Sequence, residues 1–204
     1  HSMSCNEAGR KYKILLLSRY ESLAASTRYR LLQYVPYLER AGYSVQFEPL
    51  LDDTYLTRLF SRQPVSKIDV VRAYVRRMRQ MLSSREFDVI WIYFEALPWL
   101  PHWMEALLLR SHAAVIVDYD DAIFHRYDQH PSTVVRRVLG SKIDRVMRNA
   151  AVVTAGNAYL ADRAFRAGSQ RVEIIPTVVD AERYGRKTWS LADDNVVIGW
   201  IGSP

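Results

Sequence analysis

Strand-length apolar runs alternate with helical segments along most of the chain, and this alternation restricts the fold more than any other feature of the sequence. Several runs are apolar on both faces, which is typical of strands in a parallel sheet that helices cover on both sides. The sequence therefore predicts an α/β fold with a Rossmann-like, doubly wound parallel sheet. The predicted strands are KILLLS (13–18), YSVQFEP (43–49), FDVIWIYF (87–94), AAVIVD (113–118), AVVTAG (151–156) and VEIIP (172–176).

The segments between these strands carry helical periodicity. In residues 26–42 the apolar positions recur at helical spacing, although Pro36 predicts a kink or a late start. Residues 98–111 begin with proline, and residues 132–150 begin with Ser132 as the predicted N-cap. Residues 157–168 form another predicted helix. The helix at 66–84 is amphipathic, and we expect Arg72, Arg76 and Arg79 to lie opposite an apolar face of Ile68, Val71, Val75, Met78 and Leu82.

Composition restricts the class of protein further. The chain has 204 residues, enough to bury a core, and its single cysteine, Cys5, cannot form a disulfide within the chain, which fits a reducing cytosol. No apolar run reaches the roughly 18 residues that span a bilayer. The formal net charge of +6 suits an anionic partner such as nucleic acid, anionic lipid or a phosphorylated substrate. The basic faces of residues 68–85 and 136–148 make an anionic membrane surface a candidate partner, and solvated helix faces are the alternative.

Three carboxylates crowd the end of one predicted strand: Asp118, Asp120 and Asp121. Ligands of doubly wound sheets bind beyond the carboxyl ends of the strands. At that place carboxylates can accept hydrogen bonds from sugar hydroxyls, bind a hard cation or act as bases. The pattern of Asp118 and Asp120 would also suit a metal ion bound to a nucleotide. A helix cap and an ion pair with a nearby arginine are the structural alternatives.

Two arginines and one histidine are further candidates. Arg28 and Arg30 open the predicted helix after the first strand, where guanidinium groups suit phosphate or carboxylate, or simply face water. His125 follows the acidic cluster and is either a substrate contact or a loop residue. The stretch after the first strand, YESLAAS (20–26), contains no glycine, so a glycine-rich nucleotide loop is not predicted.

Four segments occur together in a specific order: STRYRLLQYVPYLERAGY, VDYDDAIF, TAGNAYLADRA with IIPTVVDAERY, and IGWIGSP. This ordered set resembles the family-4 retaining glycosyltransferases of the GT-B fold, in the branch that builds bacterial cell-surface polysaccharides. The resemblance implies two Rossmann-like domains, of which the first holds the acceptor and the second the nucleotide-sugar. It also implies hexosyl transfer without a metal ion or other cofactor. The expected partners are a nucleotide-sugar, a glycan or lipid-linked acceptor and no nucleic acid.

The resemblance also implies roles for residues at the cleft between the domains. We expect Asp118, Asp120 and Asp121 to be catalytic, near the transferred sugar. The expected substrate-binding residues are Arg28, Arg30, Glu95, His125, Gly156 and Asn157. The cytosolic composition and a lipid-linked acceptor together predict a cytoplasmic protein, peripheral at the inner face of the cell membrane.

The domain boundaries follow from the same comparison. Residues 1–12 contain the tag scar HSM and a flexible start, and residues 13–176 form the acceptor-side domain. Residues 177–195 are a predicted linker, and 196–204 resemble the first strand of a donor-binding domain. The isolated chain is therefore expected to fold without transferring sugar.

Two other functions remain open from the residues alone. One is a GT-A glycosyltransferase that binds a metal ion through Asp118 and Asp120. The other is a non-catalytic module that binds carbohydrate or docks on a membrane.

Overall fold

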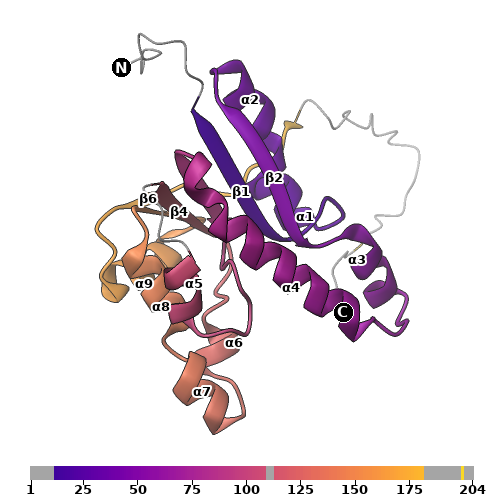
Figure 1. Cartoon of the computed structure of the whole chain (residues 1–204). Coiled ribbons are helices and arrows are strands. Elements are labelled where there is room, and N and C mark those ends of the chain that lie inside the picture. Colours follow the sequence, from indigo (N-terminus) through magenta and orange to yellow (C-terminus); the bar gives the residue numbers. More distant parts are fainter. Residues whose placement is uncertain (1–11, 109–112, 182–198, 200–204) are drawn as a thin grey trace, which may run out of the picture.

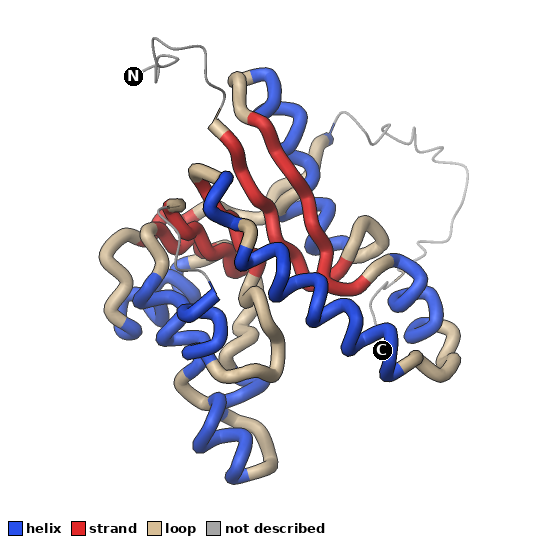
Figure 2. Tube along the Cα trace, viewed as in Figure 1, coloured by secondary structure: helices blue, strands red, loops and turns tan. Residues whose placement is uncertain are grey.

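The computed structural model describes residues 12–108, 113–181 and 199, and a six-stranded parallel sheet runs through it (Figures 1 and 2). Every neighbouring pair of strands is parallel, and the strand order is β2-β1-β3-β4-β5-β6. This topology confirms the Rossmann-like, doubly wound sheet predicted from the sequence. The strands are β1 (Lys13–Tyr20), β2 (Ser44–Leu51), β3 (Val89–Tyr93), β4 (Ala114–Tyr119), β5 (Val152–Ala155) and β6 (Val172–Ile174).

Helices cover both faces of the sheet. Alternate strand residues point to opposite faces, so Leu15 and Leu17 pack into a core with α4, α8 and α9, whereas Leu16 packs with Leu31 and Val35 on the side of α1 and α2. The helices are α1 (Ala25–Arg30), η1 (Leu32–Tyr34), α2 (Val35–Arg40), α3 (Asp53–Phe60), α4 (Lys67–Leu82), η2 (Ser84–Glu86), α5 (His102–Leu108), α6 (His125–Asp128), α7 (Thr133–Leu139), α8 (Lys142–Asn149) and α9 (Ala158–Ala167).

The chain reverses its direction of winding between β1 and β3. The strand order places β2 on one side of β1 and all later strands on the other. Such a switch point opens a crevice beyond the carboxyl ends of the two strands, where ligands of this fold class bind. The acidic loop that follows β4 lies at the same carboxyl edge, one strand further along the sheet.

Two predicted helices are interrupted in the structure. Residues 26–42 form α1, η1 and α2 in succession, and Pro36 lies in the first turn of α2, where its missing N–H costs nothing. Residues 132–150 divide into α7 and α8 around Gly140, and the Ser132 side chain makes no capping hydrogen bond. The short helices α3 and α6 were not predicted from the sequence.

Helix α4 is rotated relative to the sequence prediction. Its buried residues are Ala73, Arg77 and Met81, whereas Ile68 and Leu82 are 66% and 61% exposed. Residues 68, 75 and 79 are separated by nearly whole turns and share one side of the helix, with 77 opposite. The apolar and basic residues therefore lie side by side in solvent, and the predicted opposition of two faces was wrong.

Arg77 is a buried residue of α4 that binds the sheet. Its Nη2 donates to the backbone oxygens of Ser18 and Glu48, both at 2.8 Å, where β1 and β2 run side by side. Burial lowers the pKa of Arg77 to about 9. The small side chain of Ala73, one turn earlier, lets the helix approach the sheet.

Three of the predicted segments lie largely or wholly outside the residues that the structure describes. The tag scar lies within residues 1–11, and the structure describes only 177–181 of the predicted linker and only Gly199 of the predicted second-domain strand.

Candidate site at the carboxyl edge

Asp118 is the innermost of the three predicted carboxylates and is only 1% exposed. Its Oδ2 and Oδ1 accept hydrogen bonds from Arg30 Nε at 2.9 Å and Arg30 Nη2 at 2.5 Å, and Thr154 also donates to Oδ1. Burial raises the pKa of Asp118, and the Arg30 guanidinium opposes that shift. Both oxygens are therefore occupied by protein, and Asp118 acts as an anchor for α1.

The strand register explains this arrangement. Tyr93, Asp118 and Thr154 are aligned partners on β3, β4 and β5, so their side chains lie in one row on the same face of the sheet. Arg30 reaches this row from the end of α1, and its Nη1 also donates to the Ile175 oxygen at 2.6 Å. The row therefore connects α1, three central strands and the chain after β6.

Asp120 lies just beyond the end of β4 and is half-buried. Tyr93 donates its hydroxyl proton to Asp120 Oδ1 at 2.5 Å. Burial and the neighbouring Asp120 carboxylate raise the pKa of Tyr93, so the phenol stays protonated and remains a donor. This hydrogen bond fixes one Asp120 oxygen at the carboxyl edge.

Gly156 allows the loop after β5 to approach this carboxylate closely. Its N–H donates to the Tyr119 oxygen at 2.7 Å, and a Cβ at position 156 would lie 3.1 Å from the Asp120 Cα. Any larger residue at this position would press on the acidic loop. The structure thus brings Gly156 and Asp120 together at the carboxyl edge.

Asp121 is exposed, unlike its two neighbours. Its Oδ1 accepts the Ala122 N–H at 2.7 Å, and its backbone oxygen accepts the Ile123 N–H at 2.9 Å in the same turn. It is therefore the carboxylate of the cluster that solvent or a ligand can reach most easily.

His125 and Asn157 lie further along the loops and already have protein partners. His125 Nδ1 is 2.9 Å from Asp128 Oδ1, and His125 Nε2 is 2.9 Å from the Tyr159 hydroxyl. The side-chain oxygen of Asn157 caps α9 by accepting the Leu160 N–H at 3.0 Å. Both residues are at least partly accessible, but their observed contacts are structural.

Glu95 is buried on the other face of the sheet and belongs to a second ion cluster. It accepts hydrogen bonds from the Tyr127 hydroxyl at 2.8 Å and from Lys142 Nζ at 2.5 Å. Lys142 Nζ also lies 2.9 Å from Glu105, whose pKa burial raises. The predicted solvated basic face at 136–148 is therefore wrong for Lys142, which is 1% exposed.

This second cluster holds the loop after β3 in an unusual backbone conformation. Phe94 and Trp99 have positive φ angles of 66° and 61°. Such angles are strained for bulky residues and persist where surrounding contacts enforce them. Here the Tyr127 hydroxyl accepts the Trp99 N–H at 3.0 Å, and Lys142 donates to the Leu97 oxygen at 2.5 Å.

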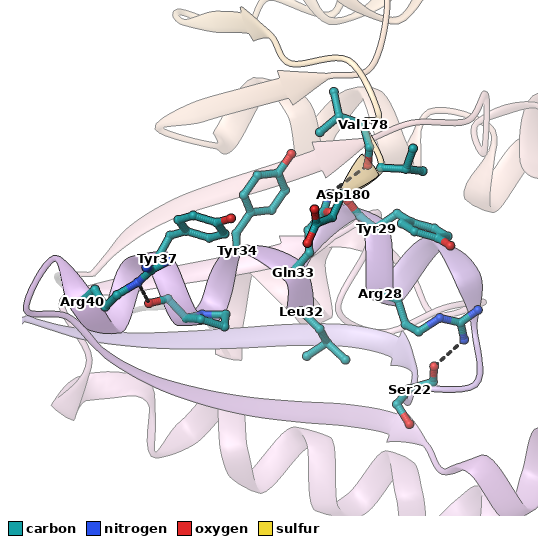
Figure 3. Close-up of a pocket in the computed structure, with 12 residues that line it drawn as sticks. Ser22, Arg28, Tyr29, Leu32, Gln33, Tyr34, Tyr37, Arg40, Val178 and Asp180 are labelled. Carbon is teal, nitrogen blue, oxygen red and sulfur yellow. Dashed lines mark hydrogen bonds between the residues drawn. The ribbon is translucent and has the colours of Figure 1, made fainter. Parts of the chain in front are cut away.

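Arg28 and Arg30 lie in the last turn of the six-residue α1, not at a helix start. Arg30 is buried against Asp118, whereas Arg28 is exposed and its Nη1 donates to the oxygens of Ser22 and Leu23. Arg28 lines a pocket of about 700 Å³ between the α1–α2 region and residues 178–180 (Figure 3). The structure therefore does not bring Arg28 into one pocket with the acidic loop.

The lining of this pocket is aromatic, basic and apolar. Figure 3 shows Tyr37 beside Arg40 at one end and Arg28 beside Ser22 at the other. The Arg40 guanidinium carbon lies 4.5 Å from the centre of the Tyr37 ring. The remaining lining residues are Tyr29, Leu32, Gln33, Tyr34, Pro36, Val178, Val179 and Asp180.

Several residues of these clusters were missed from the sequence. Tyr93 and Thr154 contact the acidic cluster only because their strands neighbour β4 in register. A polar residue near the end of a buried strand was the available signal for both. Tyr127 and Lys142 gave no such signal, because they belong to helices that had no predicted role in the site.

The described part of the chain contains neither a cluster of metal-ligating side chains nor a membrane-spanning helix. Within it, no group of three or more His, Cys, Asp or Glu side chains could hold a metal ion, and no helix is long and apolar enough to cross a bilayer. No protein-family model matches the chain, and no curated protein matches it either. A functional assignment therefore depends on the site itself and on the resemblance seen in the sequence.

Proposed function

We propose that the chain is the acceptor-side domain of a GT-B glycosyltransferase that moves a sugar from a nucleotide-sugar to a glycan or lipid-linked acceptor. One observation carries the proposal: two carboxylates stand at the carboxyl edge of a doubly wound sheet, one fixed by Tyr93 and the other exposed. The resemblance of four ordered segments to family-4 enzymes supplies the reaction class. Surface polysaccharide synthesis at the inner face of the membrane is the proposed setting.

The proposed chemistry follows from the charge of the loop. Glycosyl transfer develops positive charge at the anomeric carbon, and fixed negative charge nearby stabilises that centre. Asp120 is held in place by the Tyr93 hydroxyl and by the close approach of Gly156. We assign Asp120 and Asp121 to contact with sugar, because their carboxylates are the accessible ones of the cluster.

The buried candidates receive a different role in this proposal. Asp118, Arg30 and Glu95 are each at most 2% exposed and bonded to protein groups. We assign them as positioning residues that hold the loops after β3 and β4. His125 and Asn157 are proposed contacts of the acceptor beside the acidic loop, and Arg28 is a proposed contact in the separate pocket that it lines. A second domain is proposed to bind most of the nucleotide-sugar.

The alternative hypothesis, a GT-A enzyme that binds a metal ion and a nucleotide through Asp118 and Asp120, has less support. Both oxygens of Asp118 accept hydrogen bonds from Arg30 or Thr154, so metal binding would require the Arg30 pair to break. Calorimetric titration with Mn²⁺ and a nucleotide-sugar distinguishes the GT-B hypothesis from the GT-A hypothesis. Tight binding that requires both components would favour the GT-A enzyme.

The experiment that tests the proposal is Asp121→Asn in a protein that contains both domains. We expect kcat to fall by about 10²–10³, because a preorganised charge near the reacting centre is lost. The melting temperature should hardly change, since the exposed carboxylate has only a local turn contact.

A matched control is Asp162→Asn, which removes an exposed carboxylate paired with Arg166 on α9. It should leave both turnover and melting unchanged. Near-normal turnover of Asp121→Asn with a lowered melting temperature would show that Asp121 stabilises the fold instead of the transition state.

A further inference from the structure

Helix α4 presents an apolar stripe to solvent. Ile68, Val71 and Leu82 are 66%, 62% and 61% exposed, and Val75 shares their side of the helix. Helix α3 ends just before α4 in Phe60, which is 71% exposed. Figure 1 shows α4 across the front of the sheet, with α3 close to its beginning. Isolated apolar residues are ordinary on a surface, but a stripe of this length marks an interaction site.

Basic residues are concentrated in the segment that carries this stripe, although Arg76 Nη2 donates to the Leu50 oxygen at 2.9 Å. Residues 58–85 contain eight Arg and Lys residues and a single acidic residue, Asp69, although the whole chain carries only +6. Arg77 is buried, but the other seven basic residues are exposed. These seven are Arg58, Arg62, Lys67, Arg72, Arg76, Arg79 and Arg85. Together with Leu59, Phe60, Ile68, Val71, Val75 and Leu82 they form what we term the α3–α4 surface.

The combination of charge and apolarity selects among partners. A nucleic acid would match the positive charge but leave the apolar stripe in water. A bilayer with anionic headgroups matches both, because apolar side chains enter the acyl boundary while Arg and Lys remain among the headgroups. Helix α4 has 16 residues, so it is about 24 Å long and can lie flat over several lipids.

We infer that the α3–α4 surface docks this protein on an anionic membrane, with α4 lying in the plane of the interface. The inference does not depend on glycosyl transfer. It concerns a surface on the outer side of α4, opposite the buried residues Ala73, Arg77 and Met81 that face the sheet. Because these three residues face the sheet, the stripe on the opposite side of the helix lies in solvent.

Co-sedimentation of the full chain with lipid vesicles tests this inference. Vesicles contain phosphatidylcholine alone or a mixture with phosphatidylglycerol, at low and at high salt. We expect binding to the anionic vesicles only, weakened by salt because screening shortens the reach of the arginines. Equal binding to neutral vesicles, or no binding to anionic vesicles at low salt, would overturn the inference.

Paired variants locate the contact. Lys67→Gln with Arg79→Gln should lower the partition coefficient by about 30-fold, since each basic residue near the surface contributes about 1 kcal/mol. Ile68→Gln with Val71→Gln should lower it by about tenfold through loss of apolar insertion. All four residues are exposed, so circular dichroism and melting should match the unaltered chain.

Helix α7 supplies the control, because it carries Val134 and Val138 at 70% and 56% exposure beside Arg136 and Arg137. Val134→Gln with Val138→Gln should leave vesicle binding unchanged. Loss of binding in this control but not in the α4 variants would overturn the assignment to α4. The inference would also be overturned if the chain did not bind anionic vesicles but bound an oligonucleotide. The same holds if it did not bind them but formed a dimer that the α4 variants dissociate.

Discussion

The carboxyl edge of the sheet holds two buried ion clusters, one on each face, and they differ in charge balance. On the face of α1, a single carboxylate, Asp118, meets a single guanidinium, Arg30, in a two-pronged contact. On the other face, Lys142 lies between two carboxylates, Glu95 and Glu105. All five residues are at most 2% exposed.

The difference predicts how each cluster responds to pH. A balanced pair has no surplus charge, whereas two ionised carboxylates around one ammonium leave a buried negative charge. Burial raises the pKa of Glu105, so the folded state holds that proton more tightly than the unfolded state does. Stability from this group is greatest below the unfolded pKa, about 4.3, and is lost as the pH rises through the folded pKa.

The largest effect is expected from Lys142→Met. It leaves Glu95 and Glu105 buried without their cation, and breaking a buried pair in this way costs about 5 kcal/mol. Urea unfolding at pH 7 and pH 5 measures the change. The loss should be smaller at pH 5, because protonation removes the repulsion between the two carboxyl groups.

Glu105→Gln is the companion variant, since it restores one charge of each sign around Lys142. Its side-chain oxygen can still accept the Leu97 N–H, now at 3.0 Å from Glu105 Oε1. We expect stability at pH 7 to be unchanged or slightly higher, with a weaker dependence on pH. A large loss of unfolding free energy at pH 7 would mean that Lys142 needs both carboxylates to be ionised.

A smaller loss is expected from Arg30→Met in the balanced cluster. Only one carboxylate loses its cation, and Thr154 still donates to it, so we expect about 3 kcal/mol in the free energy of unfolding. Arg28→Met, two residues earlier and exposed, should cost about 1 kcal/mol or less. Adding Asp118→Leu to Arg30→Met should recover much of the stability, and no recovery would contradict the assignment of a simple ion pair.

The smallest effect is expected from Gly156→Ala, beside the balanced cluster. The added methyl group would contact the Asp120 backbone at 3.1 Å, so the acidic loop must shift by a few tenths of an ångström. We expect a loss of about 1 kcal/mol. A crystal structure of the variant should show Asp120 displaced from the Tyr93 hydroxyl, and an unmoved loop with full stability would refute the close approach.

The fold was predictable in outline because its signal is local. Runs such as those at 113–118 and 151–156 are short, rich in valine and mostly apolar on both faces, and helical segments separate them, which is typical of buried parallel strands. The breaks in the helices were less predictable. Pro36 indicated one break. The glycine at position 140 lies within a helical pattern, from which a kinked helix and two separate helices could not be distinguished.

The candidate site was only half visible in the sequence. The acidic loop could be placed at the carboxyl edge because it follows a predicted strand. The partners of Asp118 and Asp120 could not be named, because Arg30 is 88 residues away and Tyr93 27 residues away along the chain. The Tyr93 contact requires the strand order, which places β3 beside β4, and the Arg30 contact also requires that α1 packs on that face of the sheet.

The sequence by itself determined the parallel sheet, the edge at which the carboxylates gather and the excess of positive charge in residues 58–85. These follow from spacing and composition, which are properties of neighbouring residues. Only the tertiary structure decided which charges are buried. Lys142 and Arg77 both lie in segments that read as solvated basic faces, yet both are 1% exposed. The physical reason is that a buried cation is stable only beside carboxylates or carbonyl oxygens, and these come from distant parts of the chain.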